Sequence, residues 1–141
     1  MRAAVRIVVA IISLVMFSCI APQSAHMVSV DMQSWSKVES VAYDNSDTLS
    51  QRNLNIAIRY NDDCKEVSLP LKIAITTPDR RVFEDTIALQ LQHPATALTV
   101  ATTESLPYRS KVVLNQKGTY SFAFEPLTSV RGVEAIGIEF K

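Results

Sequence analysis

The chain has 141 residues, with 14 basic and 14 acidic side chains and three glycines. This length fits one domain, and the balanced charge gives no electrostatic reason to bind nucleic acid or an anionic membrane surface. With only three glycines, the sequence does not contain a glycine-rich phosphate-binding loop.

The first 18 residues have the pattern of a secretory signal peptide. Arg2 and Arg6 form a positive start, and a mostly apolar run covers residues 7–17. The run is shorter than the roughly 20 residues of a membrane-spanning helix. Cys19 follows directly, and the segment before it resembles a bacterial lipoprotein box. We expect Cys19 to be the acylated first residue of the mature chain. The alternative is an ordinary signal peptide in which Cys19 has no special role.

Cleavage before Cys19 leaves 123 residues, which is 141 less 18, with 12 basic and 14 acidic side chains. A bacterial lipoprotein cysteine carries three acyl chains, which anchor a protein to a membrane far more firmly than one chain does. We expect residues 19–27 to be the acylated cysteine and a tether, and residues 28–141 to form a single domain. Acylation leaves Cys64 as the free thiol of the mature chain. It is either a half-buried structural cysteine or a group for an intermolecular disulfide or another thiol reaction.

After the tether, short segments alternate apolar and polar residues with the two-residue period of a half-buried strand. The clearest lie at 54–60, 69–75, 83–91, 120–124 and 136–140, with weaker candidates at 28–32, 98–100 and 111–114. Short strands spaced by roughly 8–12 residues predict an all-β antiparallel β-sandwich, immunoglobulin-like or jelly-roll-like. The predicted core consists of Ile56, Ile58, Leu71, Ile73, Ile87, Leu89, Tyr120, Phe122, Phe124, Ile136 and Ile138.

The connections and one strand carry further predictions. The polar segment 61–66 predicts a hairpin between the strands at 54–60 and 69–75. Pro70 has no N–H for a ladder, so its strand is an edge strand or begins there. A short helical turn is expected at 126–132, ended by Gly132.

Two side chains stand out by their positions. Asp85 is the one polar residue on an apolar strand face. It needs a donor such as Arg109 or Arg131, or a bulge near Glu84 that turns it outward. Trp35, the one tryptophan, is expected in the core or at a sandwich edge rather than as a ligand platform.

The sequence contains no recognisable catalytic constellation. His26 falls in the tether and His93 in a turn, and neither belongs to a triad-like string. Cys64 and its acidic neighbours lack zinc-ligand spacing. The acidic loops 44–47 and 61–63 lack the spacing of a calcium loop. We therefore expect no enzyme activity, no metal and no cofactor.

A series of short motifs follows the signal peptide. In chain order these are Trp35, Arg59-Tyr60-Asn61, Thr77-Pro78-Asp79, Asp85-Thr86, Gly118-Thr119-Tyr120-Ser121-Phe122 and Gly132-Val133-Glu134-Ala135-Ile136-Gly137-Ile138-Glu139. Their order and spacing over residues 28–141 resemble the gliding motility lipoprotein GldH family of Bacteroidetes. The chain differs from the family pattern at residues 62–66 and in the loop after Glu125.

The resemblance implies a lipid-anchored, non-enzymatic, periplasm-facing envelope protein that supports gliding or the associated secretion machinery through protein contacts. The alternative is a carbohydrate- or peptide-binding envelope lipoprotein. A sugar binder would expose several aromatic side chains on one face. Tyr120, Phe122 and Phe124 instead fit a core stripe.

Two surfaces are the first candidates for partner contact, because exposed strand edges and loops are natural docking sites. One is the edge strand that bears Pro70. The other is the segment 61–66, whose candidate partner-binding residues are Asn61, Asp62, Asp63 and Glu66. Its carboxylates favour a partner with a basic patch.

Overall fold

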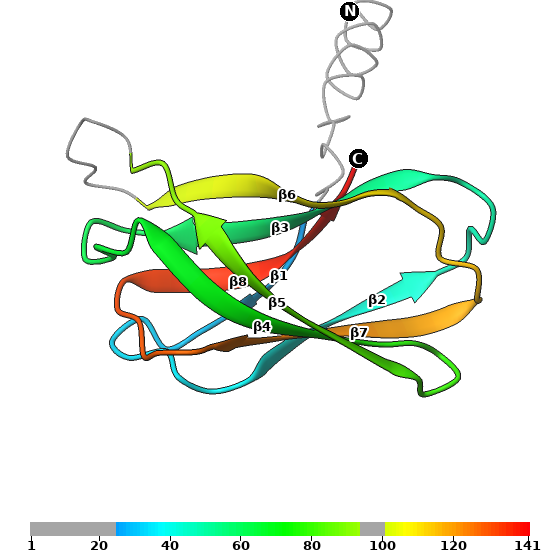
Figure 1. Ribbon diagram of the computed structural model, residues 1–141, viewed down its shortest axis with the longest axis horizontal. Helices are drawn as coiled ribbons and strands as arrows, with labels where there is room; N and C mark the ends of the chain where they lie inside the picture. The colour runs from blue at the N-terminus through cyan, green and yellow to red at the C-terminus, as the bar shows by residue number, and fades with distance from the viewer. Residues whose placement is uncertain (1–24, 94–100) are drawn as a thin grey trace, which may run out of the picture.

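The computed structural model describes residues 25–93 and 101–141, which contain eight strands and no helix (Figure 1). The strands are β1 (Ala25–Ser29), β2 (Glu39–Asn45), β3 (Arg52–Tyr60), β4 (Ser68–Thr76), β5 (Val82–Gln90), β6 (Thr102–Val112), β7 (Gly118–Pro126) and β8 (Val133–Phe140). They form two antiparallel sheets of four strands. The first sheet has the order β1-β8-β3-β6, and the second β2-β7-β4-β5. The predicted β-sandwich is confirmed, and this strand order is that of the jelly roll.

The two sheets bury their apolar faces against each other because the sequence alternates with the strand period. In β7, Tyr120, Phe122 and Phe124 are buried, whereas Ser121 and Ala123, which alternate with them, are half-buried. All the predicted core residues are buried except Ile87, which is half-buried because β5 is an edge strand. Trp35 is also buried. It forms a backbone bridge with Val130, as expected of a core residue at a sandwich edge.

Pro70 lies in an inner strand, so the predicted edge strand is wrong. β4 pairs with β7 on one side and β5 on the other. The prolyl carbonyl accepts the N–H of Leu127 at 3.1 Å, so the missing prolyl N–H would point to the β7 side. The β4–β7 pairing begins only at Leu71. The alternative prediction, that Pro70 marks the start of its strand, accounts for its position.

Two other segments differ from the sequence prediction, and three predicted features lie outside the described residues. Residues 25–27, expected in the tether, belong to β1. In the segment 126–132, expected as a helical turn, Pro126 ends β7 and the following residues form bends and a bridge. The signal peptide, Cys19 and the strand candidate at 98–100 lie outside the described residues. Within the described part of the chain, no helix has the length and apolar composition to cross a membrane.

The connections that follow β1, β3, β5 and β7 all pass from one sheet to the other at the same end of the sandwich. This crossover end is on the left in Figure 1. The segment 61–66 is therefore a crossover between sheets, and the predicted hairpin is wrong. The alternation of apolar and polar residues predicted which faces of β3 and β4 are buried. It did not predict that the two strands belong to different sheets.

We predict that Phe122→Ala lowers the free energy of unfolding by about 3–5 kcal/mol, because the side chain is 1% exposed in the core. Phe83→Ala is the matched control, since the Phe83 side chain is 58% exposed. We expect it to cost less than about 1 kcal/mol. Denaturant unfolding measures both values. A Phe122→Ala cost as small as that of Phe83→Ala would contradict the assigned register of β7.

Candidate functional site

The loop 61–66 is organised by Asn61. The Asn61 N–H donates to the carbonyl of Gly132 at 2.9 Å, and its own carbonyl accepts the N–H of Cys64 at 3.1 Å. Its side-chain oxygen accepts the N–H of Asp63 at 2.9 Å. Asn61 therefore shapes the loop and attaches it to the segment that leads into β8.

Gly132 lies where three connections of the crossover end meet. Its φ angle is 82°, in the left-handed region that favours glycine. A β-carbon at this position would lie 2.2 Å from the nitrogen of Cys64, which is closer than atoms can approach. Its N–H donates to the carbonyl of Met32 at 2.9 Å, in the connection between β1 and β2. Glycine is thus required by both backbone angle and space.

Glu134 connects two of the sequence motifs. Its carboxylate accepts a hydrogen bond from Arg59 Nε at 3.0 Å and another from Asn61 Nδ2 at 3.3 Å. The Arg59-Tyr60-Asn61 and Gly132-Val133-Glu134 motifs therefore form one contact cluster. The sequence prediction did not place them together, because they lie more than 70 positions apart.

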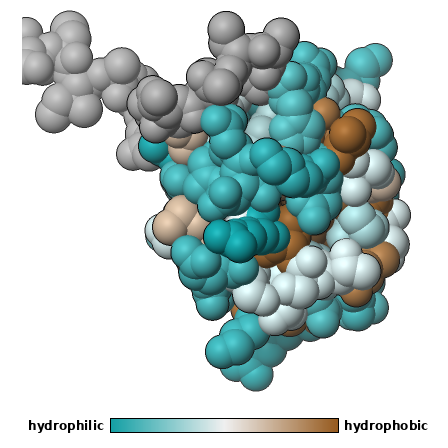
Figure 2. All heavy atoms as spheres, turned by 90° about the vertical axis from the view of Figure 1, so that its left-hand side faces the viewer, coloured by the Kyte–Doolittle hydropathy of each residue, from teal (hydrophilic) through white to brown (hydrophobic). Residues whose placement is uncertain are grey.

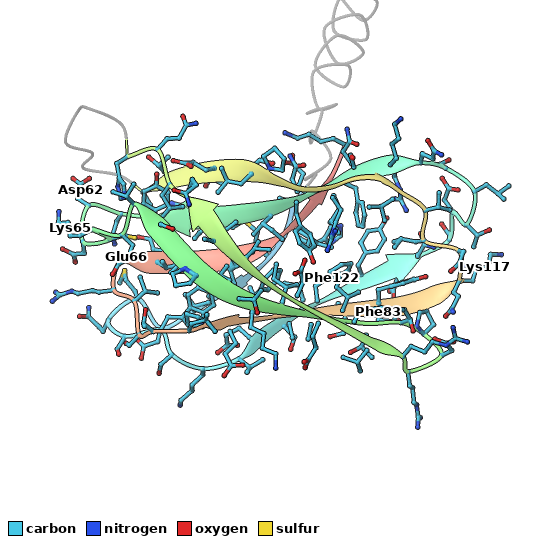
Figure 3. The ribbon with its side chains drawn as sticks, viewed as in Figure 1. Asp62, Lys65, Glu66, Phe83, Lys117 and Phe122 are labelled. Carbon is cyan, nitrogen blue, oxygen red and sulfur yellow. The ribbon has the colours of Figure 1, made fainter. Side chains whose placement is uncertain are left out.

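Asp62 and Asp63 are the exposed carboxylates of the loop. Figure 3 labels Asp62 at the crossover end, near Lys65 and Glu66. Cations lie beside them. Arg131 Nε is 3.7 Å from Asp63 Oδ2, and Lys65 Nζ donates to the carbonyl of Asp62. Figure 2 views this end and shows a mostly hydrophilic surface with separate hydrophobic patches. The neighbouring cations thus reduce the acidic surface that the sequence predicted for this loop.

Glu66 is half-buried and takes part in the loop's own structure. Its Oε2 accepts the N–H of Lys65 at 3.1 Å and lies 3.5 Å from Cys64 Sγ. Its carbonyl oxygen contacts His93 Nε2 at 2.6 Å. Of the four candidate partner-binding residues, Asn61 and Glu66 therefore have structural contacts, and Asp62 and Asp63 face solvent.

Cys64 is a buried free thiol within the core cluster. The structural role expected for it fits this position, although the side chain is fully rather than half buried. Burial raises the pKa of the Cys64 thiol to about 11. Because the thiolate is the reactive form, the buried thiol is unreactive near neutral pH.

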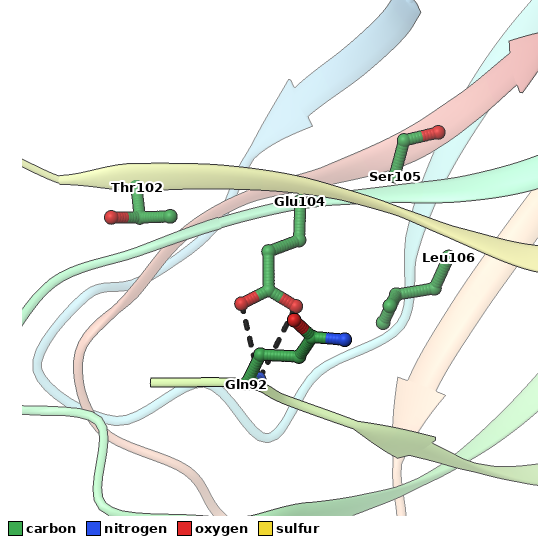
Figure 4. A pocket seen from close by; sticks show the side chains of 5 residues that line it. All are labelled: Gln92, Thr102, Glu104, Ser105 and Leu106. Carbon is green, nitrogen blue, oxygen red and sulfur yellow. Dashed lines mark hydrogen bonds between the residues drawn. The ribbon is translucent and has the colours of Figure 1, made fainter. Parts of the chain in front are cut away.

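Another carboxylate at the crossover end, that of Glu104, accepts a hydrogen bond from a tyrosine. The Tyr60 hydroxyl donates to Glu104, whose carboxylate also accepts the N–H of Gln92 at 3.1 Å (Figure 4). Burial, with the bond to Glu104, raises the pKa of Tyr60 to about 12. A hollow of about 340 Å³ lies beside Glu104 and Gln92. Since the carboxylate is already hydrogen-bonded twice, it serves to join β3, β6 and the segment after β5.

Asp85 joins the two sheets through hydrogen bonds between the edge strands β5 and β6. One carboxylate oxygen accepts the N–H of Thr86 at 2.9 Å. The other accepts Arg109 Nη2 at 2.6 Å and the Tyr108 hydroxyl at 3.2 Å. The pairing of β4 with β5 has no bulge, so Arg109 is the correct alternative of those considered. Arg131, the other candidate donor, pairs with Asp63.

Sequence reasoning missed Arg52 at the opposite end. Its guanidinium lies 4.5 Å from the ring centre of Phe140 and donates to the Tyr43 hydroxyl at 2.7 Å and to Asn45 Oδ1 at 3.1 Å. A single arginine before an alternating strand gives no signal for such packing. The described residues contain no group of three or more His, Cys, Asp or Glu side chains that would hold a metal ion.

The comparisons with known proteins give one family. The family model described as GldH lipoprotein matches residues 24–140. The matched range contains all eight strands, from β1 to the end of β8. The comparison with curated protein sequences gives no match.

We predict that Cys64 resists alkylation in the folded protein at pH 8 and reacts quickly once denaturant unfolds the chain, because burial keeps it protonated and covered. Time-resolved mass measurement of the alkylated protein checks this. Equal rates in both states would contradict the burial of the thiol.

The same raised pKa predicts a pH dependence of stability. The folded state holds the proton more tightly than a thiol of ordinary pKa 9.0. The contribution of Cys64 is therefore complete below about pH 9 and is lost as the pH rises toward 11. Cys64→Ala should remove this part of the pH dependence of unfolding.

Proposed function

The chain belongs to the GldH lipoprotein family, and on this basis we propose that it supports gliding or the associated secretion machinery by binding other envelope proteins. Membership of a lipoprotein family places it in the cell envelope, attached to a membrane. We assign the lipid to Cys19, which follows the apolar run of the signal peptide. The family match over residues 24–140 is the observation that carries this proposal.

The crossover end is the proposed contact surface. Asp62 and Asp63 project from a loop whose backbone is held by Asn61 and Gly132. A rigid loop loses little conformational entropy on binding. Exposed carboxylates select a basic partner patch and act mainly on the association rate and its salt dependence.

The chemistry of the described side chains supports a binding role rather than catalysis. Cys64 is a buried, protonated thiol. The carboxylates of Glu104 and Asp85 are hydrogen-bonded to tyrosine hydroxyls and backbone N–H groups of the fold itself. These groups stabilise the connections between strands. We therefore propose a protein that is not an enzyme.

The aromatic side chains favour a protein-binding role over the carbohydrate-binding alternative. Tyr120, Phe122 and Phe124 are all buried between the sheets. They are unavailable for stacking on a sugar ring, which needs an exposed aromatic face.

We predict that the double variant Asp62→Lys and Asp63→Lys loses envelope partners that the native chain recovers after cross-linking in cells, with the larger loss at low salt. Both side chains are exposed, so the fold should persist. Mass spectrometry of the cross-linked products measures the recovery of each partner. Asn61 and Glu66 are left unchanged, since replacing them would alter the loop.

Glu39→Lys together with Glu84→Lys is the matched control. It makes the same change of charge in β2 and β5, on the second sheet. Partner recovery should stay at the native level in this control. Equal recovery by the loop variant and the native chain at low salt would remove the loop from the proposed contact surface.

A further inference from the structure

The described part of the chain begins at Ala25 in β1. Ala25 is the first of four residues that pair with one another from strand to strand across the first sheet. Ala25 pairs with Glu139, Glu139 with Asn55, and Asn55 with Pro107. Directly paired residues place their side chains on the same face of a sheet. With strands about 4.8 Å apart, the row runs about 14 Å over the outer face, from β1 to β6.

A surface hollow of about 390 Å³, here named the β6 hollow, lies at the far end of this row. It is lined by Asn53 and Asn55 of β3, by residues 107–110 of β6 and by Lys141. The hollow is located where β6 departs from regular pairing, with register shifts on both sides of Leu54. Bulges of this kind are common beside binding sites because they redirect side chains.

The backbone beside the β6 hollow is also unusual. Lys111 has a φ angle of 54°, in a region that residues other than glycine seldom adopt. Its N–H donates to Asn53 Oδ1 at 3.3 Å, which helps to hold this conformation. The conformation places an exposed lysine next to the hollow.

The charges around the β6 hollow are arranged with the cations outermost. The Arg109 side chain is 58% exposed and the Asp85 side chain that pairs with it is 33% exposed. Lys141 is 54% exposed and its partner Glu139 only 14%. Lys111 adds a third exposed cation. Around the hollow, three cations thus stand against two carboxylates, an excess of one positive charge carried by exposed side chains, although the charges of the whole chain balance.

We propose that the β6 hollow binds the phosphate of an anionic phospholipid headgroup and so sets the β6 side of the domain against the bilayer. The inference rests on the proposed lipid anchor at Cys19. Only five residues separate Cys19 from Ala25, so the tether spans at most about 20 Å. Guanidinium, ammonium, amide and hydroxyl groups are all donors to phosphate oxygens, and basic pockets at a membrane surface bind such headgroups.

This orientation separates the proposed membrane contact at the β6 hollow from the proposed partner contact at the crossover end. Asn61 directly follows the end of β3 and lies six residues after Asn55, which corresponds to about 20 Å of extended chain. The crossover end, with Asp62 and Asp63, is then displaced along the sheet from the membrane contact and stays accessible to partner proteins. In Figure 1, β6 and the C-terminus lie along the upper side, and the crossover end lies at the left.

The test uses the mature chain, residues 19–141, with Cys19→Ala, so that neither the apolar run of the signal peptide nor an acyl chain masks the contact. Its binding to vesicles of phosphatidylcholine is compared by flotation with its binding to vesicles in which one third of the lipid is phosphatidylglycerol. We expect binding only to the anionic vesicles, weakened by salt. Each basic side chain near such a surface contributes roughly five-fold, so Lys111→Gln with Lys141→Gln should weaken binding roughly 25-fold.

Lys37→Gln with Lys65→Gln is the matched control, since it removes the same charge outside the β6 hollow, and it should bind nearly as well as the parent chain. Equal weakening by the two double variants, or no preference for anionic vesicles, overturns the proposal. Inorganic phosphate that shifts the amide signals of Ser110 and Lys111 without any vesicle binding also overturns it, in favour of a soluble phosphate site. A Cys19→Ala chain that remains with cell membranes after a high-salt wash would contradict the proposed anchor instead.

Discussion

The close approach of Gly132 to the loop 61–66 is the constraint on which the crossover end depends. Two crossings between the sheets, one after β3 and one before β8, pass each other within backbone contact at this point. The hydrogen bonds from Asn61 to Gly132 and from Gly132 to Met32 join a third crossing to them. A jelly roll brings its crossings together at the sandwich ends. Here Gly132, which has no side chain, makes the contact. The backbone that carries the exposed carboxylates of Asp62 and Asp63 is therefore held in place.

The sequence predicts β3, β4, β5, β7 and β8, because alternation has a direct physical cause in the strand period. No candidate covered β2, and the candidate at 111–114 met only the end of β6. The sequence does not predict sheet membership. β3 and β4 have similar alternation and a short polar connection, yet they belong to different sheets. Pro70 shows the same limit, since its missing N–H is compatible with an inner strand when the neighbouring ladder begins one residue later. Local patterns report what a strand buries but not which strand it pairs with.

The candidate site was predicted in part for a similar reason. Exposed Asp62 and Asp63 follow from a polar loop. The need of Asp85 for a donor was also predicted, but only the structure selects Arg109 over Arg131 and over a bulge. The contact of Glu134 with Arg59 and Asn61 joins distant positions and becomes visible only with the topology. Asn61 and Glu66 were predicted to contact a partner, but their polar groups form hydrogen bonds within the loop and to the segments beside it. For this reason the proposed partner contact is limited to the exposed carboxylates and does not include the whole segment.

The alkylation rate of Cys64 in a Gly132→Ala chain tests the central claim most directly. A β-carbon at this position must displace the Cys64 backbone, so local opening should become easier by about 1.4–3 kcal/mol, and alkylation roughly ten- to a hundred-fold faster. Gly118→Ala is the control. It also replaces a glycine of positive φ, but at the turn packed on Pro78, and should leave the rate near that of the native chain. Native protection of Cys64 in Gly132→Ala, with unchanged thermal stability, would contradict the account.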